Sequence, residues 1–184
     1  MAKINLLACT DRPDSNALKL ARFIAPKYEA VGAEIDVISL EEYPVAEIIG
    51  GSYNSKLPGV AAFNERLLDA DGIVFIVPEY NGSFPGILKF MMDYMPFPVS
   101  LDKFPVAFIG EAAGAFGGLR AVEHLQGVCG YRNAMMFPER VFIQRVSAVF
   151  TPENGISHQL TADLLDSQIA NFHTFAGDFS RRPK

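Results

Sequence analysis

The sequence predicts one α/β domain of three layers, in which helices cover both faces of a five-stranded parallel sheet. Short apolar runs alternate with longer segments whose apolar residues recur at helical spacing, the pattern of strands joined by crossover helices. The runs are apolar almost throughout, as strands covered on both faces require. Five strands in 184 residues favour the strand order 2-1-3-4-5 and a single domain over residues 1–184.

The first strand is expected at Lys3–Cys9 and the second at Glu34–Leu40. Between them, apolar residues recur at helical spacing from Ala17 to Ile24. Pro26 is expected to kink or end this helix near Ile24, because proline removes a helical hydrogen bond. Residues 41–55 have weak periodicity and contain a glycine pair, so they are predicted to be mainly loop.

The rest of the chain continues the alternation of helices and strands. The helix after residue 118 is expected to bury Val122, Leu125 and Cys129. The other expected elements are a helix at 58–70, a strand at Gly72–Val77, a helix ending near Tyr94, a strand at Pro105–Gly110, a strand around Glu139–Ile143, and a last helix at 161–179 that buries Leu165, Ile169, Phe172, Ala176 and Phe179.

The composition, 49% hydrophobic and 20% charged, is that of an ordinary globular protein. A net charge of -5 argues against nucleic acid as a partner. No apolar run reaches the roughly 18 residues of a membrane span, and no signal-peptide pattern is visible. Cys9 and Cys129 form no disulfide or metal framework, which suggests a reduced cytoplasmic setting. His124, His158 and His173 lack ligand spacing, so no metal site is expected.

The most informative segment is Val77–Lys89, which joins the third strand to the next helix. Asn81 and Gly82 tolerate positive φ and indicate a turn. Ser83 is expected to cap the helix, and Pro85 suits its first turn. This segment therefore offers free backbone amides at the carboxyl end of a strand, where ligands bind in open α/β sheets.

From Pro78 to Lys89 the sequence resembles the NAD(P)H-dependent FMN reductase family, flavodoxin-like proteins that share the block Pro-Glu-Tyr-Asn-Gly-Ser-x-Pro-Gly-x-Leu-Lys. The resemblance extends over roughly residues 3–143. It implies the flavodoxin-like fold and an FMN whose ring lies along this turn. The alternative is a strand, turn and helix that bind nothing. The implied cofactor-binding residues in the turn are Pro78, Glu79, Tyr80, Asn81, Gly82 and Ser83.

A second block, Cys9–Asn16, follows the first strand. A phosphate there would meet unpaired amides and the positive end of a helix dipole. The family carries a Thr/Ser-x-Arg-x-x-Ser-x/Asn pattern at this place, which holds the FMN phosphate. The resemblance therefore implies phosphate contacts from Thr10, Arg12, Ser15 and Asn16, and from Ala17 through its amide.

This second block departs from the family in several places. Cys9 stands where glycine is frequent, and Ala17 where a hydroxyl residue is frequent. Asp11 and Asp14 bring negative charge close to the expected phosphate. One alternative is therefore that Ser15 or Asp14 merely caps the helix while Arg12 stays in solvent, and another is that Cys9 is a buried thiol.

A third loop, Gly114–Ala121, follows the fourth strand. Glycines let the backbone approach a flat ring closely. The family has a comparable glycine-rich loop that borders the flavin, which implies cofactor contacts from Gly114, Gly117 and Gly118.

The expected helix at Ile87–Met95 has few polar residues, Lys89 and Asp93 among them. Helices that are apolar nearly all round are buried. The resemblance implies a homodimer or homotetramer assembled through this helix, although Phe90 replaces an asparagine that is frequent in the family. The alternative is burial within one large core.

The function implied is transfer of electrons from NADH or NADPH through FMN to a small acceptor, such as a quinone, azo dye, nitro compound or metal oxyanion. No side chain is needed as a covalent catalyst; Tyr80 is expected to line the pocket, and Glu79 is either a site acid or a turn-stabilising carboxylate. A binding or interaction protein of the same fold with weak or lost flavin affinity is the main alternative. An electron-carrier flavodoxin and a low-molecular-weight tyrosine phosphatase are less favoured, the latter because the two residues between Cys9 and Arg12 are too few to wrap a phosphate.

Overall fold

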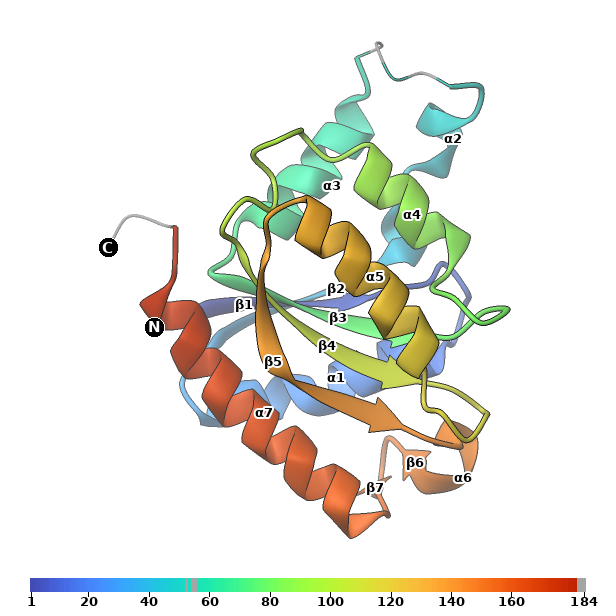
Figure 1. Cartoon of the computed structure of the whole chain (residues 1–184), viewed down its shortest axis with the longest axis vertical. Helices are drawn as coiled ribbons and strands as arrows, with labels where there is room; N and C mark the ends of the chain where they lie inside the picture. Colours follow the sequence, from blue (N-terminus) through green and yellow to red (C-terminus); the bar gives the residue numbers. More distant parts are fainter. Residues whose placement is uncertain (52, 54–55, 182–184) are drawn as a thin grey trace.

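The computed structural model describes residues 1–51, 53 and 56–181. Its centre is a five-stranded parallel sheet in the order β2-β1-β3-β4-β5 (Figure 1). The predicted fold class and strand order are therefore confirmed. The strands are β1 (Lys3–Ala8), β2 (Glu34–Ser39), β3 (Gly72–Pro78), β4 (Pro105–Glu111) and β5 (Met135–Ile143).

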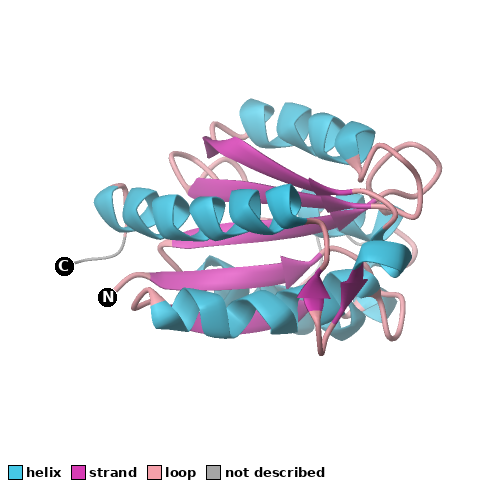
Figure 2. Ribbon diagram, turned by 90° about the horizontal axis from the view of Figure 1, so that it is seen from below, coloured by secondary structure: helices cyan, strands magenta, loops and turns pink. Residues whose placement is uncertain are grey.

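Helices lie on both sides of this sheet, as the edge-on view of Figure 2 shows. None of the helices in the described residues has the length and apolarity to cross a membrane. The longer helices are α1 (Asn16–Ala30), α3 (Pro58–Leu68), α4 (Gly86–Asp93), α5 (Leu119–Tyr131) and α7 (Gln159–Asp178). The shorter elements are the 3-10 turn η1 (Leu40–Glu42), α2 (Val45–Ile48), α6 (Val146–Val149) and the hairpin of β6 (Phe150–Thr151) and β7 (Gly155–Ile156).

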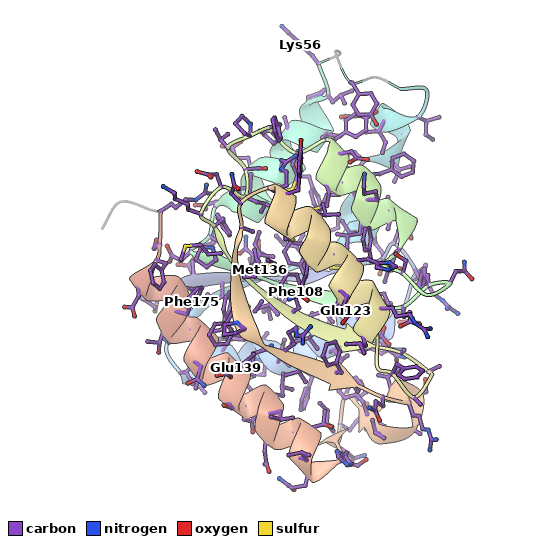
Figure 3. All side chains as sticks on the ribbon, in the orientation of Figure 1. Lys56, Phe108, Glu123, Met136, Glu139 and Phe175 are labelled. Carbon is purple, nitrogen blue, oxygen red and sulfur yellow. The ribbon has the colours of Figure 1, made fainter. Side chains whose placement is uncertain are left out.

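The hydrophobic core has two parts because side chains alternate along each strand. Phe75 of β3 belongs to the cluster packed under α3, α4 and α5, whereas its neighbours Val74 and Ile76 belong to the cluster packed against α1 and α7. Phe75 stacks on Phe108 of β4, labelled in the interior of Figure 3, with ring centroids 5.9 Å apart. Burial on both faces explains why the strands read as continuous apolar runs.

Helix α1 runs through Pro26, so of the two predicted outcomes, a kink or an end near Ile24, the end was wrong. The helix continues to Ala30, and the amide of Gly32 closes its end by donating to the carbonyl of Glu29 at 2.9 Å. Tyr28, about one turn after the expected end at Ile24, is completely buried. Burial of a large side chain offsets the hydrogen bond that proline removes.

Helix α4 also begins differently from the prediction. Its N-cap is Pro85, with φ -59° and ψ 142°, and no side chain caps it, so Ser83 is not the cap and Pro85 is not in the first turn. Tyr80 and Ser83 instead exchange two backbone hydrogen bonds, of 2.8 and 3.1 Å. This closed turn directs the Ser83 hydroxyl to Nδ1 of His124, 2.9 Å away, rather than to the helix amides.

Other differences concern element ends. Strand β5 begins at Met135, four residues earlier than expected, and its pairing with β4 shifts register between Val106 and Phe108. Phe179 was expected to be buried but is 48% exposed, because α7 ends at Asp178. The segment 41–55 was predicted to be mainly loop but contains η1 and α2; its residues 52, 54 and 55 lie outside the described residues.

Candidate functional site

A cleft of about 480 Å³ opens at the carboxyl ends of the central strands. In Figure 1 the arrowheads of these strands point toward this end of the sheet. Loops after β1, β3 and β4 form most of its wall, and helix α6 completes it. The lining residues are Arg12, Pro13, Asp14, Ser15, Asn16, Pro78, Glu79, Tyr80, Glu111, Ala112, Ala113, Val146 and Ser147.

The N-terminus of α1 borders the cleft. Ser15 is the N-cap, and its Oγ accepts a hydrogen bond of 3.2 Å from the amide of Leu18. The amides of Asn16 and Ala17 donate to no group within the described residues. The first amides of a helix have no partner inside it, and the helix dipole places positive potential there. This part of the cleft therefore suits an anion. The side chain of Ala17 is buried and does not line the cleft, so Ala17 could contribute only through its amide.

A hydrogen bond joins the loops that carry the first two motifs. Thr10 Oγ1 lies 2.8 Å from the hydroxyl of Tyr80, 70 positions away in the chain. Thr10 is completely buried beneath the lining residues, and its Oγ1 also accepts from the amide of Arg12 at 3.2 Å. The tertiary structure therefore brings the Cys9–Asn16 block and the Tyr80 loop to one site.

Arg12 is exposed, yet it lines the cleft and acts electrostatically on the carboxyl group of Glu111. It is the only cation among the described lining residues. The capping interpretation of this loop is correct for Ser15, but Arg12 is not isolated in solvent. The same residues can therefore cap the helix and hold a ligand.

Glu111, the last residue of β4, is a cleft residue that sequence reasoning missed. It is only 5% exposed, and its side chain accepts no hydrogen bond from the described residues. Burial raises the pKa of its carboxyl group to about 7, with the positive charge of Arg12 acting in the opposite direction. Its carbonyl accepts from the amide of Glu79 at 3.1 Å, which joins the two loops.

Glu79 follows β3 and lines the same cleft. Its Oε2 is buried without a hydrogen-bond partner in the described residues. Asn81 and Gly82 form the predicted turn, with φ of 52° and 77°. These two residues and Ser83 lie outside the lining, so this loop contributes to the cleft through Pro78, Glu79 and Tyr80.

The predicted glycines of the third loop also lie outside the lining. A Cβ on Gly117 would lie 3.0 Å from the backbone of Ile143, and one on Gly118 would lie 2.8 Å from the backbone of Glu111. Both have positive φ, so they let the loop pack tightly on the ends of β4 and β5. The carbonyl of Gly114 accepts from the amide of Arg145 at 3.1 Å. The small side chains of Ala112 and Ala113 face the cleft in their place.

The lining contains no metal-binding set, since no three His, Cys, Asp or Glu residues within the described part of the chain gather as ligands. Cys9 lies in the core, where its Sγ is 3.3 Å from the carbonyl of Leu7, and burial raises its pKa well above the usual value. The interpretation of Cys9 as a buried thiol is correct. The cleft thus combines hydrogen-bond donors and one cation with small side chains and one aromatic ring.

Residues 2–147 match the model of the family described as NADPH-dependent FMN reductase. The chain belongs to this family. The predicted resemblance is confirmed, and this reductase family member is an NAD(P)H-dependent oxidoreductase rather than a phosphatase or an electron carrier.

Its relatives are reductases as well. An NAD(P)H-dependent FMN reductase from Pseudomonas aeruginosa is 36% identical over 152 residues, 77% of this chain and 80% of that protein. A quinone reductase from Escherichia coli strain K12 is 29% identical over 165 residues, 86% of this chain and 85% of that protein. A 2-hydroxy-1,4-benzoquinone reductase from Burkholderia sp is 41% identical over 88 residues, and this match spans about half of each chain, 46% and 48%.

Solved structures share the fold of this reductase. The flavoenzyme NAD(P)H:(acceptor) oxidoreductase from Paracoccus denitrificans superposes with a TM-score of 0.81 at 21% identity, covering 98% of this chain and 100% of that one. An NADH:FMN oxidoreductase in its apo form superposes with a TM-score of 0.79 at 16% identity, covering 100% of this chain and 92% of that one.

Some residues that line the cleft of this reductase were not predicted from the sequence, and they differ in whether the sequence could have indicated them. Glu111 directly follows the predicted strand Pro105–Gly110, which neighbours the third strand in the predicted order, so the rule for ligand positions could have identified it. Val146 and Ser147 belong to α6, which no periodic pattern indicated. The amide of Val146 donates to the carbonyl of Ala112 at 3.0 Å, and this contact is what brings α6 to the cleft.

Proposed function

We propose that the cleft binds FMN and that the enzyme uses it to pass electrons from NADH or NADPH to a small acceptor. A quinone is the acceptor class that the names of several relatives indicate. The observation that carries this proposal is the bond between Thr10 and Tyr80, which unites the two motif loops around one cleft.

The end of the cleft at α1 fits the phosphate of FMN. The free amides of Asn16 and Ala17 can donate to phosphate oxygens, and Arg12 adds a charge-assisted hydrogen bond. The Ser15 hydroxyl accepts from Leu18 but keeps its own hydrogen to donate. Thr10 supports this loop from below through its bond to the Arg12 amide.

The lining residues that follow β3 and β4 fit the flavin ring. Ala112 and Ala113 leave room for a flat ring, and Tyr80 is held at its edge by Thr10. The unpartnered Oε2 of Glu79 is a buried acceptor that a polar N–H of the ligand would satisfy. In this proposal the turn residues Asn81, Gly82 and Ser83 and the glycines Gly114, Gly117 and Gly118 shape the two loops around the ring.

The chain's own residues bind, orient and shield the ligand. When bound, FMN would supply the chemistry itself, by accepting a hydride from the nicotinamide and delivering electrons to the acceptor. The apolar walls at Pro78, Ala112 and Val146 exclude water from one side of the ligand. No side chain of the cleft is required as a nucleophile.

A variant that fills the cleft tests the proposal. FMN fluorescence is titrated with the unmodified protein, with Ala113→Trp and with Ala62→Trp. Ala113 lines the cleft, whereas Ala62 is an exposed alanine of α3 outside it. We expect the unmodified protein and Ala62→Trp to bind FMN, and Ala113→Trp to lose most of its affinity because the indole ring occupies the space of the ligand.

Two outcomes would contradict the proposal. If the unmodified protein bound no FMN at high concentration, the alternative of a related binding protein without flavin would hold. If Ala113→Trp bound FMN as tightly as Ala62→Trp, the flavin site would lie elsewhere. With FMN bound, oxidation of NADH and NADPH in the presence of a quinone then measures the activity.

A further inference from the structure

The cleft has an unusual charge balance for a site that holds a phosphate. Its described lining residues include three carboxyl groups, those of Asp14, Glu79 and Glu111, and one cation, Arg12. Glu111 is the carboxyl group whose residue is almost fully buried at the end of a central strand. An ionised Glu111 would repel a bound dianion and would compete with it for Arg12.

Ligand binding changes the surroundings of Glu111 in two ways. A phosphate that engages Arg12 neutralises the cation that lowers the pKa of Glu111, and the ligand displaces water from the cleft. Both changes disfavour the charged carboxylate. We propose that Glu111 binds the ligand of this cleft as a neutral carboxylic acid, so that an anionic ligand enters together with one proton. The inference rests on the proposed function in taking FMN as this ligand.

In the protein without a ligand, the pKa of Glu111 already lies near neutral pH. The pKa of Glu111 is about 7 before any ligand is present, so a small further increase makes the neutral form dominant at neutral pH. A neutral carboxyl group has an O–H that can donate a hydrogen bond to a ligand oxygen, whereas a carboxylate can only accept. Because the side-chain carboxyl group of Glu111 has no hydrogen-bond partner in the described residues, this donor is available to the ligand.

The titratable groups that line the cleft together with Glu111 come from two loops. The loop after β1 contributes Arg12 and Asp14, and the loop after β3 contributes Glu79 and Tyr80. The α6 residues on the remaining side, Val146 and Ser147, bring no charge. Of these groups, Arg12 is the one whose charge lowers the pKa of Glu111, so a phosphate that engages Arg12 would favour protonation of Glu111.

The pH dependence of FMN affinity tests the inference. The dissociation constant is measured from about pH 6 to about pH 9 for the unmodified protein, Glu111→Gln and Glu79→Gln. For the unmodified protein and Glu79→Gln we expect the constant to rise by up to about tenfold per pH unit above about pH 7, since one proton is taken up with the ligand. Glu111→Gln, which is neutral at every pH, should lose this slope. The second pKa of a phosphate, at about 6, affects all three proteins alike.

A second measurement, of the protons taken up when FMN binds, tests the inference without the Glu111→Gln variant. Titration calorimetry of the unmodified protein at about pH 8, in two buffers of different ionisation enthalpy, should show an uptake approaching one proton per FMN. Binding of FMN without proton uptake, or an equal pH slope in Glu111→Gln, would overturn the inference and leave the proposed function intact. Failure of all three proteins to bind FMN at any pH would instead contradict the proposed function.

Discussion

At the scale of single residues, Arg12 supplies the positive charge of the described cleft lining. It is exposed and makes no side-chain hydrogen bond within the described residues, yet it lies against the ligand space and acts on Glu111. The motif that carries Arg12 predicted it as a phosphate contact. Its reach to Glu111 could not be predicted, because the two residues meet only when the ends of β1 and β4 are brought to the same edge of the sheet.

Replacement of Arg12 measures its contribution to phosphate binding. Arg12→Ala should weaken FMN binding about tenfold or more, because a hydrogen bond to a charged group contributes about 1.5–3 kcal/mol. Arg22→Ala, at an exposed position of α1 outside the cleft, should leave the affinity unchanged. Circular dichroism checks that both variants fold. An unchanged dissociation constant for Arg12→Ala would refute its role as a phosphate ligand.

The buried carboxyl of Glu111 should also make stability depend on pH. Its pKa rises from 4.5 to about 7 on folding because of burial, so the folded state binds more protons between these values. Stability is therefore lost as pH rises from about 4.5 through about 7, by up to about 3 kcal/mol for this group.

Glu111→Gln should remove this loss. Its stability relative to the unmodified protein should be up to about 3 kcal/mol more favourable at about pH 8 than at about pH 4.5. Urea unfolding of both proteins at the two pH values measures the difference. A difference between the proteins that is the same at both pH values would show that Glu111 does not titrate on folding.

At the scale of elements, helix α4 shows how much a pattern of apolar residues can predict. Its composition predicted burial nearly all round, and Leu88, Met91 and Met92 are indeed packed in the core of the same chain. Burial within one core therefore accounts for most of the pattern. Phe90 is the exception, since it is 51% exposed. The association of copies through this helix stays a prediction, and Phe90 is the exposed apolar residue of α4 that would take part in it.

Replacement of Phe90 tests the association. Phe90→Glu should shift the protein toward monomer, because a carboxylate buried between two copies has no partner charge to compensate its lost hydration. Phe179→Glu is the matched control, since Phe179 is similarly exposed at the end of α7. Light scattering measures the mass of each variant. A monomer for the unmodified protein would remove the hypothesis.

The helix starts and ends were the least predictable part of the elements. Pro26 normally stops a helix, but α1 continues because Tyr28 fills a place in the core that only the folded chain creates. Serine commonly caps helices, but the hydroxyl of Ser83 is hydrogen-bonded to His124 of a different helix. In both cases a contact between distant segments overrides the local preference.

At the scale of the whole molecule, the sheet order positions the cleft. With β1, β3 and β4 adjacent, their three following loops meet at one edge, and the bond between Thr10 and Tyr80 joins two of them. The fold is shared with solved oxidoreductase structures at sequence identities near 20%, so the architecture is retained where most side chains differ. The chemistry of the site therefore depends on a few loop residues placed on a common frame.

The sequence by itself determined the alternation of strands and helices, the family, and the loops that carry Arg12 and Tyr80. It could do so because strand burial, helical periodicity and turn residues are local properties of the chain. Only the tertiary structure decided that Glu111 and α6 join the cleft and that Gly117 and Gly118 support its wall. These are contacts between segments far apart in the chain, and the burial that shifts the pKa of Glu111 exists only once the three loops are packed together.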